Sequence, residues 1–177
     1  MLNKILVAVD NSESNQQVFD EAVSLARLTN ASLMILHVLS TLDEQYVDPL
    51  FLQPTILYPQ LQRNNSTYLN DWEKLKENRL NWLNWLCQQA TQLGVKAEFS
   101  QNIGEPSRII CDIAQNWEAD VIVIGRRGRR GLSELLMGSV SNYVLHHASC
   151  SVFTVQGIIP DAKEIGQTGK VEIISKV

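Results

Sequence analysis

Three glycines and a serine in the C-terminal third of the chain have the types and spacing suited to binding phosphate. Two residues separate Gly125 from Gly128, nine separate Gly128 from Gly138, and Ser139 follows, which gives the pattern G-x-x-G-x9-G-S. Glycine can adopt positive φ and lets an anion approach the backbone, and the free N–H groups at a helix start attract phosphate. The apolar run 121–124 predicts a buried strand before this loop, and helical spacing begins after it. Strand, glycine loop and helix start together predict a phosphate-binding site.

The same loop is rich in arginine, because it contains Arg126, Arg127, Arg129 and Arg130. A guanidinium group matches phosphate oxygens with two parallel hydrogen bonds. Since these neighbouring residues cannot all face one pocket, we expect one or two of them to contact a ligand. The alternative is a solvated loop, in which the remaining arginines contact RNA or an acidic partner. So short a run does not make an extended nucleic-acid groove.

An alternation of strands and helices is predicted to position this loop. Short apolar runs predict strands, and apolar residues that recur every three or four positions predict helices. The expected strands are 5–9, 33–39, 95–100, 120–124 and 151–155, and the expected helices are 13–28, 68–93, one that starts at 104–107, and 139–147. This order predicts a doubly wound α/β fold with a parallel sheet, whose ligands bind beyond the carboxyl ends of the strands where the winding reverses. The first and fourth strands should flank that crevice.

Two of these helices should pack on the sheet through an apolar stripe. In the long helix the stripe consists of Leu69, Trp72, Leu80, Leu83, Cys87, Ala90 and Leu93. Trp82 and Trp85 fall outside that stripe, and they either pack in the ordinary way or cover the preceding segment or a partner. The next helix should be buried through Ile109, Ile110, Ile113 and Ala114.

The composition indicates a globular, mildly acidic chain. Of its 177 residues 45% are hydrophobic and 19% are charged, and the formal net charge of −4 argues against a general nucleic-acid binder. No apolar run approaches the ~20 residues that cross a bilayer, and the N-terminus enters a strand without a signal pattern, so we expect a cytoplasmic protein with no membrane contact. The cysteines Cys87, Cys111 and Cys150 lack metal-ligand spacing and are expected to be reduced and buried.

Four stretches of the chain resemble one protein family. They are ILVAVDNSESNQQVFDEAVSLA at 5–26, ASLMILHVL at 31–39, VIVIGRRGRRGLSELLMGSVS at 121–141 and HHASCSVFTV at 146–155. The complete spaced motif behind a VAVD strand resembles the nucleotide-binding signature of the universal stress protein family, ATP-binding type. The resemblance is lost at residues 43–66, which look like an insertion, and after Gln156. It implies one domain over 1–156, a C-terminal extension over 157–177, and a Rossmann-like five-stranded sheet in the order 3-2-1-4-5.

The resemblance also implies which residues bind the nucleotide. The first strand end and the backbone of the second strand would hold the adenine and ribose, and the two glycine segments would wrap the phosphates. The implied binding residues are Ala8, Val9, Asp10, Val38, Gly125, Arg126, Arg127, Gly128, Arg129, Arg130, Gly131, Gly138, Ser139, Val140 and Ser141. The implied ligand is ATP, with ADP, AMP and cyclic or dinucleoside relatives left open, and Mg²⁺ would be held through the phosphates. Asp10 is also a favoured helix-capping type, and the two roles are compatible.

Enzymatic alternatives have less support from the sequence. The chain contains no G-x-x-x-x-G-K-S/T, and residues 10–12 replace the glycine-rich turn that dinucleotide enzymes and ATP-pyrophosphate-cleaving enzymes need after the first strand. Glu134 could face the phosphates, whereas His146 and His147 lie at least about 10 Å from Ser139 along the helix. We therefore expect a nucleotide-responsive regulatory or stress-response protein with little or no ATP hydrolysis. A very slow ATPase and a nucleotide-independent interaction module are the alternatives.

Three further segments suggest partners. The apolar residues Val152, Phe153 and Val155 of the last strand predict a homodimer at a sheet edge, and the resemblance implies the same pairing, with larger oligomers or a protein partner beyond it. Residues 43–66 contain apolar anchors and should pack over the sheet edge, a dimer neighbour or the nucleotide. The tail 157–177 should add an edge strand or reach across a partner.

Overall fold

The computed structural model describes residues 2–12, 15–40, 65–126 and 137–156, with the backbone alone for 65–71. The elements in this part of the chain are β1 (Lys4–Val9), α1 (Asn15–Thr29), β2 (Ser32–Leu39), α2 (Asn65–Gln92), β3 (Ala97–Ile103), α3 (Pro106–Asn116), β4 (Val121–Gly125), α4 (Ser139–His147) and β5 (Ser151–Val155). The predicted extension 157–177 lies outside the described residues, as does most of the predicted insertion 43–66. The long helix begins earlier than predicted, because Asn65 and Ser66 already belong to α2.

The five strands form one parallel sheet in the order β3-β2-β1-β4-β5. β1 is the central strand, and its residue Val7 pairs with Ile35 of β2 on one side and with Val123 of β4 on the other. The winding therefore reverses at β1, and the carboxyl ends of β1 and β4 lie next to each other. The predicted fold class and strand order are confirmed.

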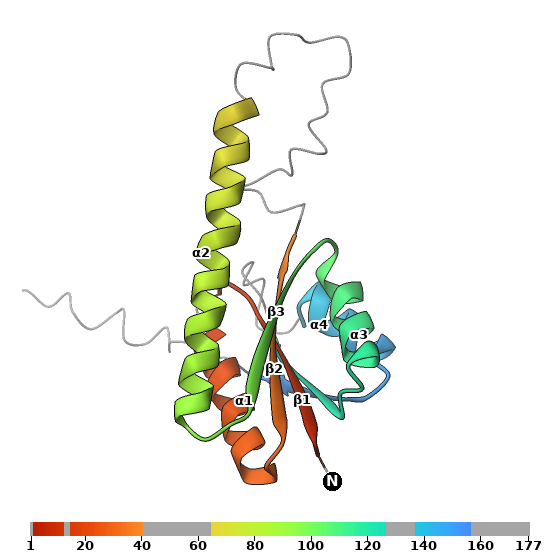
Figure 1. Cartoon of the computed structure of the whole chain (residues 1–177). Coiled ribbons are helices and arrows are strands. Elements are labelled where there is room, and N and C mark those ends of the chain that lie inside the picture. The colour runs from red at the N-terminus through yellow and green to blue at the C-terminus, as the bar shows by residue number, and fades with distance from the viewer. Residues whose placement is uncertain (1, 13–14, 41–64, 127–136, 157–177) are drawn as a thin grey trace, which may run out of the picture.

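Helices cover both faces of this sheet, with α1 and α2 on one face and α3 and α4 on the other (Figure 1). Side chains of β1 alternate between the two cores: Ile5 and Val7 pack with α1 and α2, and Leu6 packs with α3 and α4. A strand covered on both faces needs apolar side chains at successive positions. This is why uninterrupted apolar runs located the central strands from sequence.

The predicted apolar stripe of α2 is wrong at two positions. Leu80 and Leu93 are 42% and 50% exposed, whereas Leu86, which the stripe omitted, is fully buried. The buried line passes through Leu83, Leu86 and Ala90, and Leu80 lies about 120° around the helix from Leu86. Leu93 follows the last helical residue, so the helix no longer holds it against the sheet.

The other side-chain predictions for the helices hold in part. Trp82 is partly buried and packs on the core, where its ring and that of His37 are nearly perpendicular at a centroid distance of 5.8 Å, whereas Trp85 is exposed. In α3 the residues Ile110 and Ala114 are buried, and Ile109 and Ile113 pack around them partly buried. Trp82 is therefore an ordinary packing residue.

The third strand begins later than predicted. Val95 belongs to the turn that closes α2, because its N–H donates to the carbonyl of Ala90 at 3.0 Å. β3 therefore starts at Ala97, and it continues to Ile103 because it stays paired with β2 as far as Leu39. The polar sequence of its second half hid this extension from a search for apolar alternation.

Candidate functional site

The described members of the predicted nucleotide site lie at the carboxyl end of the sheet. Ala8 and Val9 end β1 and Asp10 follows it, Val38 is near the end of β2, and Gly125 ends β4 and is followed by Arg126. Gly138 precedes α4, which begins with Ser139, Val140 and Ser141. Arg127, Gly128, Arg129, Arg130 and Gly131 lie outside the described residues, as does Glu134. Because β1 is paired with both β2 and β4, three separate parts of the chain meet at this end.

The turn after β1 is ordered by the Asp10 side chain. The Asp10 carboxylate atom Oδ1 accepts hydrogen bonds from the Ser12 backbone N–H, at 3.0 Å, and from the Ser12 hydroxyl. The Asp10 N–H donates to Oδ1 of the buried Asn15 at 3.1 Å, and the Asn15 N–H donates back to the Ser12 carbonyl. Asp10 therefore has a turn-forming role and not the helix-capping role considered from the sequence, because the N–H that it binds belongs to Ser12 and α1 begins at Asn15. This role holds the carboxyl group at the end of the central strand.

The two ends of the glycine loop are bonded together beside β4. The Gly138 N–H donates to the Arg126 carbonyl at 2.9 Å, and the Arg126 N–H donates to the Val155 carbonyl at 2.8 Å. The hydroxyl of Ser141, which is buried, donates to the Gly125 carbonyl at 2.6 Å. The fold thus brings the first and last parts of the spaced motif within one hydrogen bond of each other.

Within the described residues, no side chain caps the N-terminus of α4. Gly138 is the N-cap residue, with φ −61° and ψ 151°, and as a glycine it has no side chain that could accept a hydrogen bond from the first turn. Its φ is negative, so the conformational freedom of glycine is not needed at this position, and the absence of a side chain is what glycine provides. The first N–H groups of a helix have no partner within the helix, and together with the helix dipole they favour an anion.

The N-terminus of α3 shows the opposite arrangement. The Glu105 carboxylate accepts hydrogen bonds from the N–H groups of Ser107, at 3.2 Å, and Arg108, at 3.0 Å. Partial burial alone raises the pKa of Glu105, but hydrogen bonds from Ser107 and Arg108, with the Arg108 charge, outweigh it and hold the pKa below its usual value. The first turn of α3 is therefore already bonded to a carboxylate from the chain itself.

The apolar members of the predicted site are largely core residues. Val9 is buried with α1 and α2, and Val38 is buried with α3 and α4. Ala8 is partly buried beside the second of these cores. Their side chains therefore fix the strand ends, and contact with a ligand would fall to the backbone at these positions.

Two residues of this region were missed by the sequence analysis. Asn15 holds the N–H of Asp10, and the side chain of Gln156 accepts a hydrogen bond from the Arg126 guanidinium. A polar residue at a helix start is a signal that could have indicated Asn15. Gln156 follows β5 and carries no local signal, because its partner is distant in the sequence.

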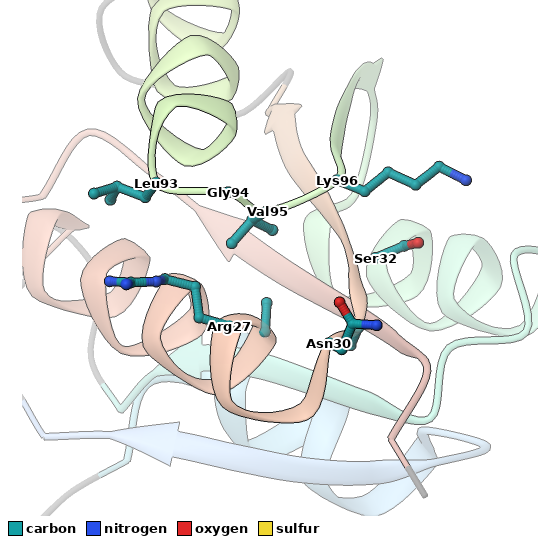
Figure 2. Close-up of a pocket in the computed structure, with 9 residues that line it drawn as sticks. Arg27, Asn30, Ser32, Leu93, Gly94, Val95 and Lys96 are labelled. Carbon is teal, nitrogen blue, oxygen red and sulfur yellow. The ribbon is translucent and has the colours of Figure 1, made fainter.

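A hollow of about 300 Å³ lies at the opposite, amino end of the sheet (Figure 2). It is lined by Ala26, Arg27, Asn30, Ala31, Ser32, Leu93, Gly94, Val95 and Lys96. Asn30 and Gly94, with φ of 55° and 85°, close α1 and α2 there, and the next residue of each turn donates back to a helix carbonyl. The described residues of the predicted site are all elsewhere, so this hollow is not part of it.

The described residues show neither a metal cluster nor a membrane-spanning helix. Among them, no three His, Cys, Asp or Glu side chains are grouped so as to hold a metal ion, and no helix is long and apolar enough to span a membrane. Cys87, Cys111 and Cys150 are free thiols that are partly buried against the core, so the prediction of reduced, buried cysteines holds in part. Burial raises the pKa of all three thiols.

Fold and site together define a class: a doubly wound α/β domain with an uncapped helix N-terminus at the point where the winding reverses. The sequence profile of the Universal stress protein family matches residues 1–156, and the chain belongs to this family. It is 38% identical over 158 residues to universal stress protein Sll1388 of Synechocystis sp., an alignment that covers 86% of this chain and 97% of the relative.

Two solved structures that carry nucleotides share the fold. One is a universal stress protein in complex with cAMP, which is 22% identical with a TM-score of 0.55 over 89% of this chain and 99% of that one. The other is a family protein from Arabidopsis thaliana with AMP bound, which is 22% identical with a TM-score of 0.56 over 94% of this chain and 97% of that one. At this identity the likeness concerns the fold alone.

Proposed function

We propose that this universal stress protein binds an adenine nucleotide at the carboxyl ends of β1 and β4 and acts as a nucleotide-responsive regulatory protein of the cytoplasm. The observation that carries the proposal is the hydrogen bond from Gly138 to Arg126, which places the uncapped start of α4 beside the end of β4. The complete G-x-x-G-x9-G-S motif and the cAMP and AMP carried by two relatives of the same fold support it.

Each end of the nucleotide has candidate partners in this chain. The amide groups at the start of α4 fit phosphate, because they combine free donors with the positive end of a helix dipole. Asp10, fixed by Ser12 and Asn15, fits a ribose hydroxyl, because its carboxylate can accept a hydrogen bond from the hydroxyl group. Mg²⁺ would neutralise a di- or triphosphate, and it would be held through phosphate oxygens, since no cluster of metal ligands occurs in the described part of the chain.

The described residues offer little for ATP hydrolysis. Phosphoryl transfer needs a group that orients the attacking water. The Ser141 hydroxyl is already bonded to the Gly125 carbonyl, and His147 lies at the far end of α4, where its Nδ1 is 2.8 Å from the Tyr143 carbonyl. We therefore expect turnover well below the ~1 per second of a slow ordinary enzyme. Binding, rather than chemistry, would be the signal.

A homodimer through β5 remains part of the proposal. β5 is an edge of the sheet, and Phe153 on it is 45% exposed. Val155 is buried in the core under α1 and α2, and Val152 packs, partly buried, against the core under α3 and α4. Phe153 and the open backbone edge would therefore make the contact. Light scattering of the wild type and of Phe153→Asp checks this: we expect twice 20.0 kDa for the first and 20.0 kDa for the second.

The proposed binding is tested with the nucleotide that the protein carries and with titration. Chromatography of the material released from heat-denatured protein should identify an adenine nucleotide, and calorimetry with AMP, cAMP, ADP and ATP with Mg²⁺ should rank the ligands. Gly138→Val should abolish binding because its side chain would occupy the space for phosphate, whereas Arg27→Ala, at the hollow of Figure 2, should bind normally. A wild type that binds none of the four would favour an interaction module without nucleotide.

A further inference from the structure

Helix α2 is much longer than the strands it covers. Its 28 residues span about 42 Å, against about 26 Å for the eight residues of β2. Figure 1 shows its first turns rising beyond the carboxyl ends of the strands, the end at which the candidate site lies. The part of α2 that is packed on the sheet includes the buried residues Leu83, Leu86 and Ala90.

One polar contact joins this helix to the turn after β1. Nη1 of Arg79 donates to Oδ1 of Asn11 at 3.0 Å, across 68 residues of sequence. Arg79 lies one helical turn before Leu83, the first residue of α2 in the buried core beneath α1 and α2.

Asn11 occupies the middle of the turn that the Asp10 carboxylate closes. Asp10 and Ser12 are bonded to each other, and Asn15 holds the N–H of Asp10. The side chain of Asn11 connects this turn to α2, because its Oδ1 accepts a hydrogen bond from Arg79. A displacement of the turn would therefore shift Arg79, and a displacement of Arg79 would shift the turn.

We propose that Arg79 is a positioning residue for the nucleotide site, which holds the Asp10–Ser12 turn through Asn11 and couples occupancy of the site to α2. The inference rests on the proposed nucleotide binding and adds to it a residue from outside the glycine motif. A coupling between two parts of a protein is reciprocal. Fixing the turn should therefore strengthen nucleotide binding, and bound nucleotide should steady α2.

The contact is exposed to solvent, so its expected effect is moderate. An interaction of a charged side chain in such an exposed position corresponds to a change of about threefold in affinity. We expect Arg79→Ala and Asn11→Ala each to weaken AMP and Mg²⁺–ATP binding by about this factor, and the double variant to be no weaker than either single one. Arg79→Lys, which can still donate to Asn11, should recover part of the loss. Lys74→Ala removes an exposed charge from the same helix and should leave affinity unchanged.

Calorimetry of these five variants and the wild type is the test, with amide hydrogen exchange of residues 72–82 as the second readout. Nucleotide should slow exchange there in the wild type and in Lys74→Ala, and less in Arg79→Ala. Additive losses in the double variant, or a loss of stability in Arg79→Ala with unchanged affinity, would overturn the inference while the proposed function stands. A wild type that binds neither AMP nor Mg²⁺–ATP would overturn both.

Discussion

Helices α3 and α4 both begin near the carboxyl end of the sheet, yet their first turns are finished differently. α3 is capped by the Glu105 carboxylate, which accepts from Ser107 and Arg108, whereas the N-cap residue of α4 is Gly138, which has no side chain that could act as a cap. Free N–H groups at a helix start need a partner, and α3 supplies a negatively charged one from its own sequence. Of these two helices, α4 is therefore the one whose first turn can receive the anion of a ligand, beside the strand ends of β1 and β4.

The largest expected effect comes from giving α4 a cap like that of α3. In Gly138→Asp the new carboxylate would accept from the first amides of α4 and repel phosphate, so we expect affinity for AMP or Mg²⁺–ATP to fall about 100-fold. The free energy of unfolding without ligand should rise by about a few tenths of a kcal/mol. Calorimetry and urea denaturation measure the two effects. Gly138→Ser, a neutral cap, should lose less affinity, and equal losses in both would argue against charge repulsion.

A smaller effect is expected from loosening α4 without capping it. Ser141→Ala removes the buried hydrogen bond to the Gly125 carbonyl, which should lower the free energy of unfolding by about 1 kcal/mol. Because that bond ties α4 to the end of β4, nucleotide affinity should also fall a few-fold. Ser139 is exposed and lies two residues before Ser141, so Ser139→Ala serves as the matched control for stability. An unchanged nucleotide affinity in Ser141→Ala would contradict the assignment of α4 to the nucleotide site.

Removing the cap of α3 should affect stability alone. Glu105→Ala deprives Ser107 and Arg108 of their acceptor and should cost about 1 kcal/mol of stability. Nucleotide affinity should stay at the wild-type value, because this helix start is already occupied. Glu105→Asp, which retains a capping carboxylate, should be milder. The comparison of the two helices fails if Glu105→Ala weakens nucleotide binding as much as Gly138→Asp does.

The smallest effect is a pH dependence at the same cap. The pKa of Glu105 in the folded chain lies below its ordinary value of 4.5, so its stabilising contribution is complete above 4.5 and is lost as pH falls through the lower folded value. The carboxyl group is mostly exposed, which limits the contribution to about a few tenths of a kcal/mol. Urea midpoints of the wild type and Glu105→Gln should differ well above pH 4.5 and converge well below it. A constant difference would contradict this assignment.

The fold could be predicted because its main signals are local. Apolar runs on β1, β2 and β4 are continuous, since these strands are covered on both faces, and helical spacing separates them. The family resemblance supplied the strand order, which periodicity does not contain. The predicted buried face of α2 was wrong at Leu80, because an apolar residue on a helix flank satisfies the same spacing as a core residue. The predicted end of β3 was wrong because the strand continues through polar residues to Ile103.

The candidate site was predictable only as a set of segments. The spaced glycines and the end of β1 indicated which segments meet, but the bond from Gly138 to Arg126 and the contact between Arg79 and Asn11 join residues far apart in the sequence. Such contacts depend on how the elements pack and leave no local pattern. The absence of a cap at Gly138 also acquires meaning only beside the capped helix α3.

The most direct test of this account is to follow individual amides of both helix starts by NMR while AMP is added. We predict large shifts of the amide signals of Ser139, Val140 and Ser141 with AMP, much smaller ones with adenosine, which has no phosphate, and none at Ser107 and Arg108, whose N–H groups already bond to Glu105. Unshifted signals at the start of α4 on saturation with AMP, or equal shifts at the two helix starts, would contradict the claim that α4 receives the phosphate.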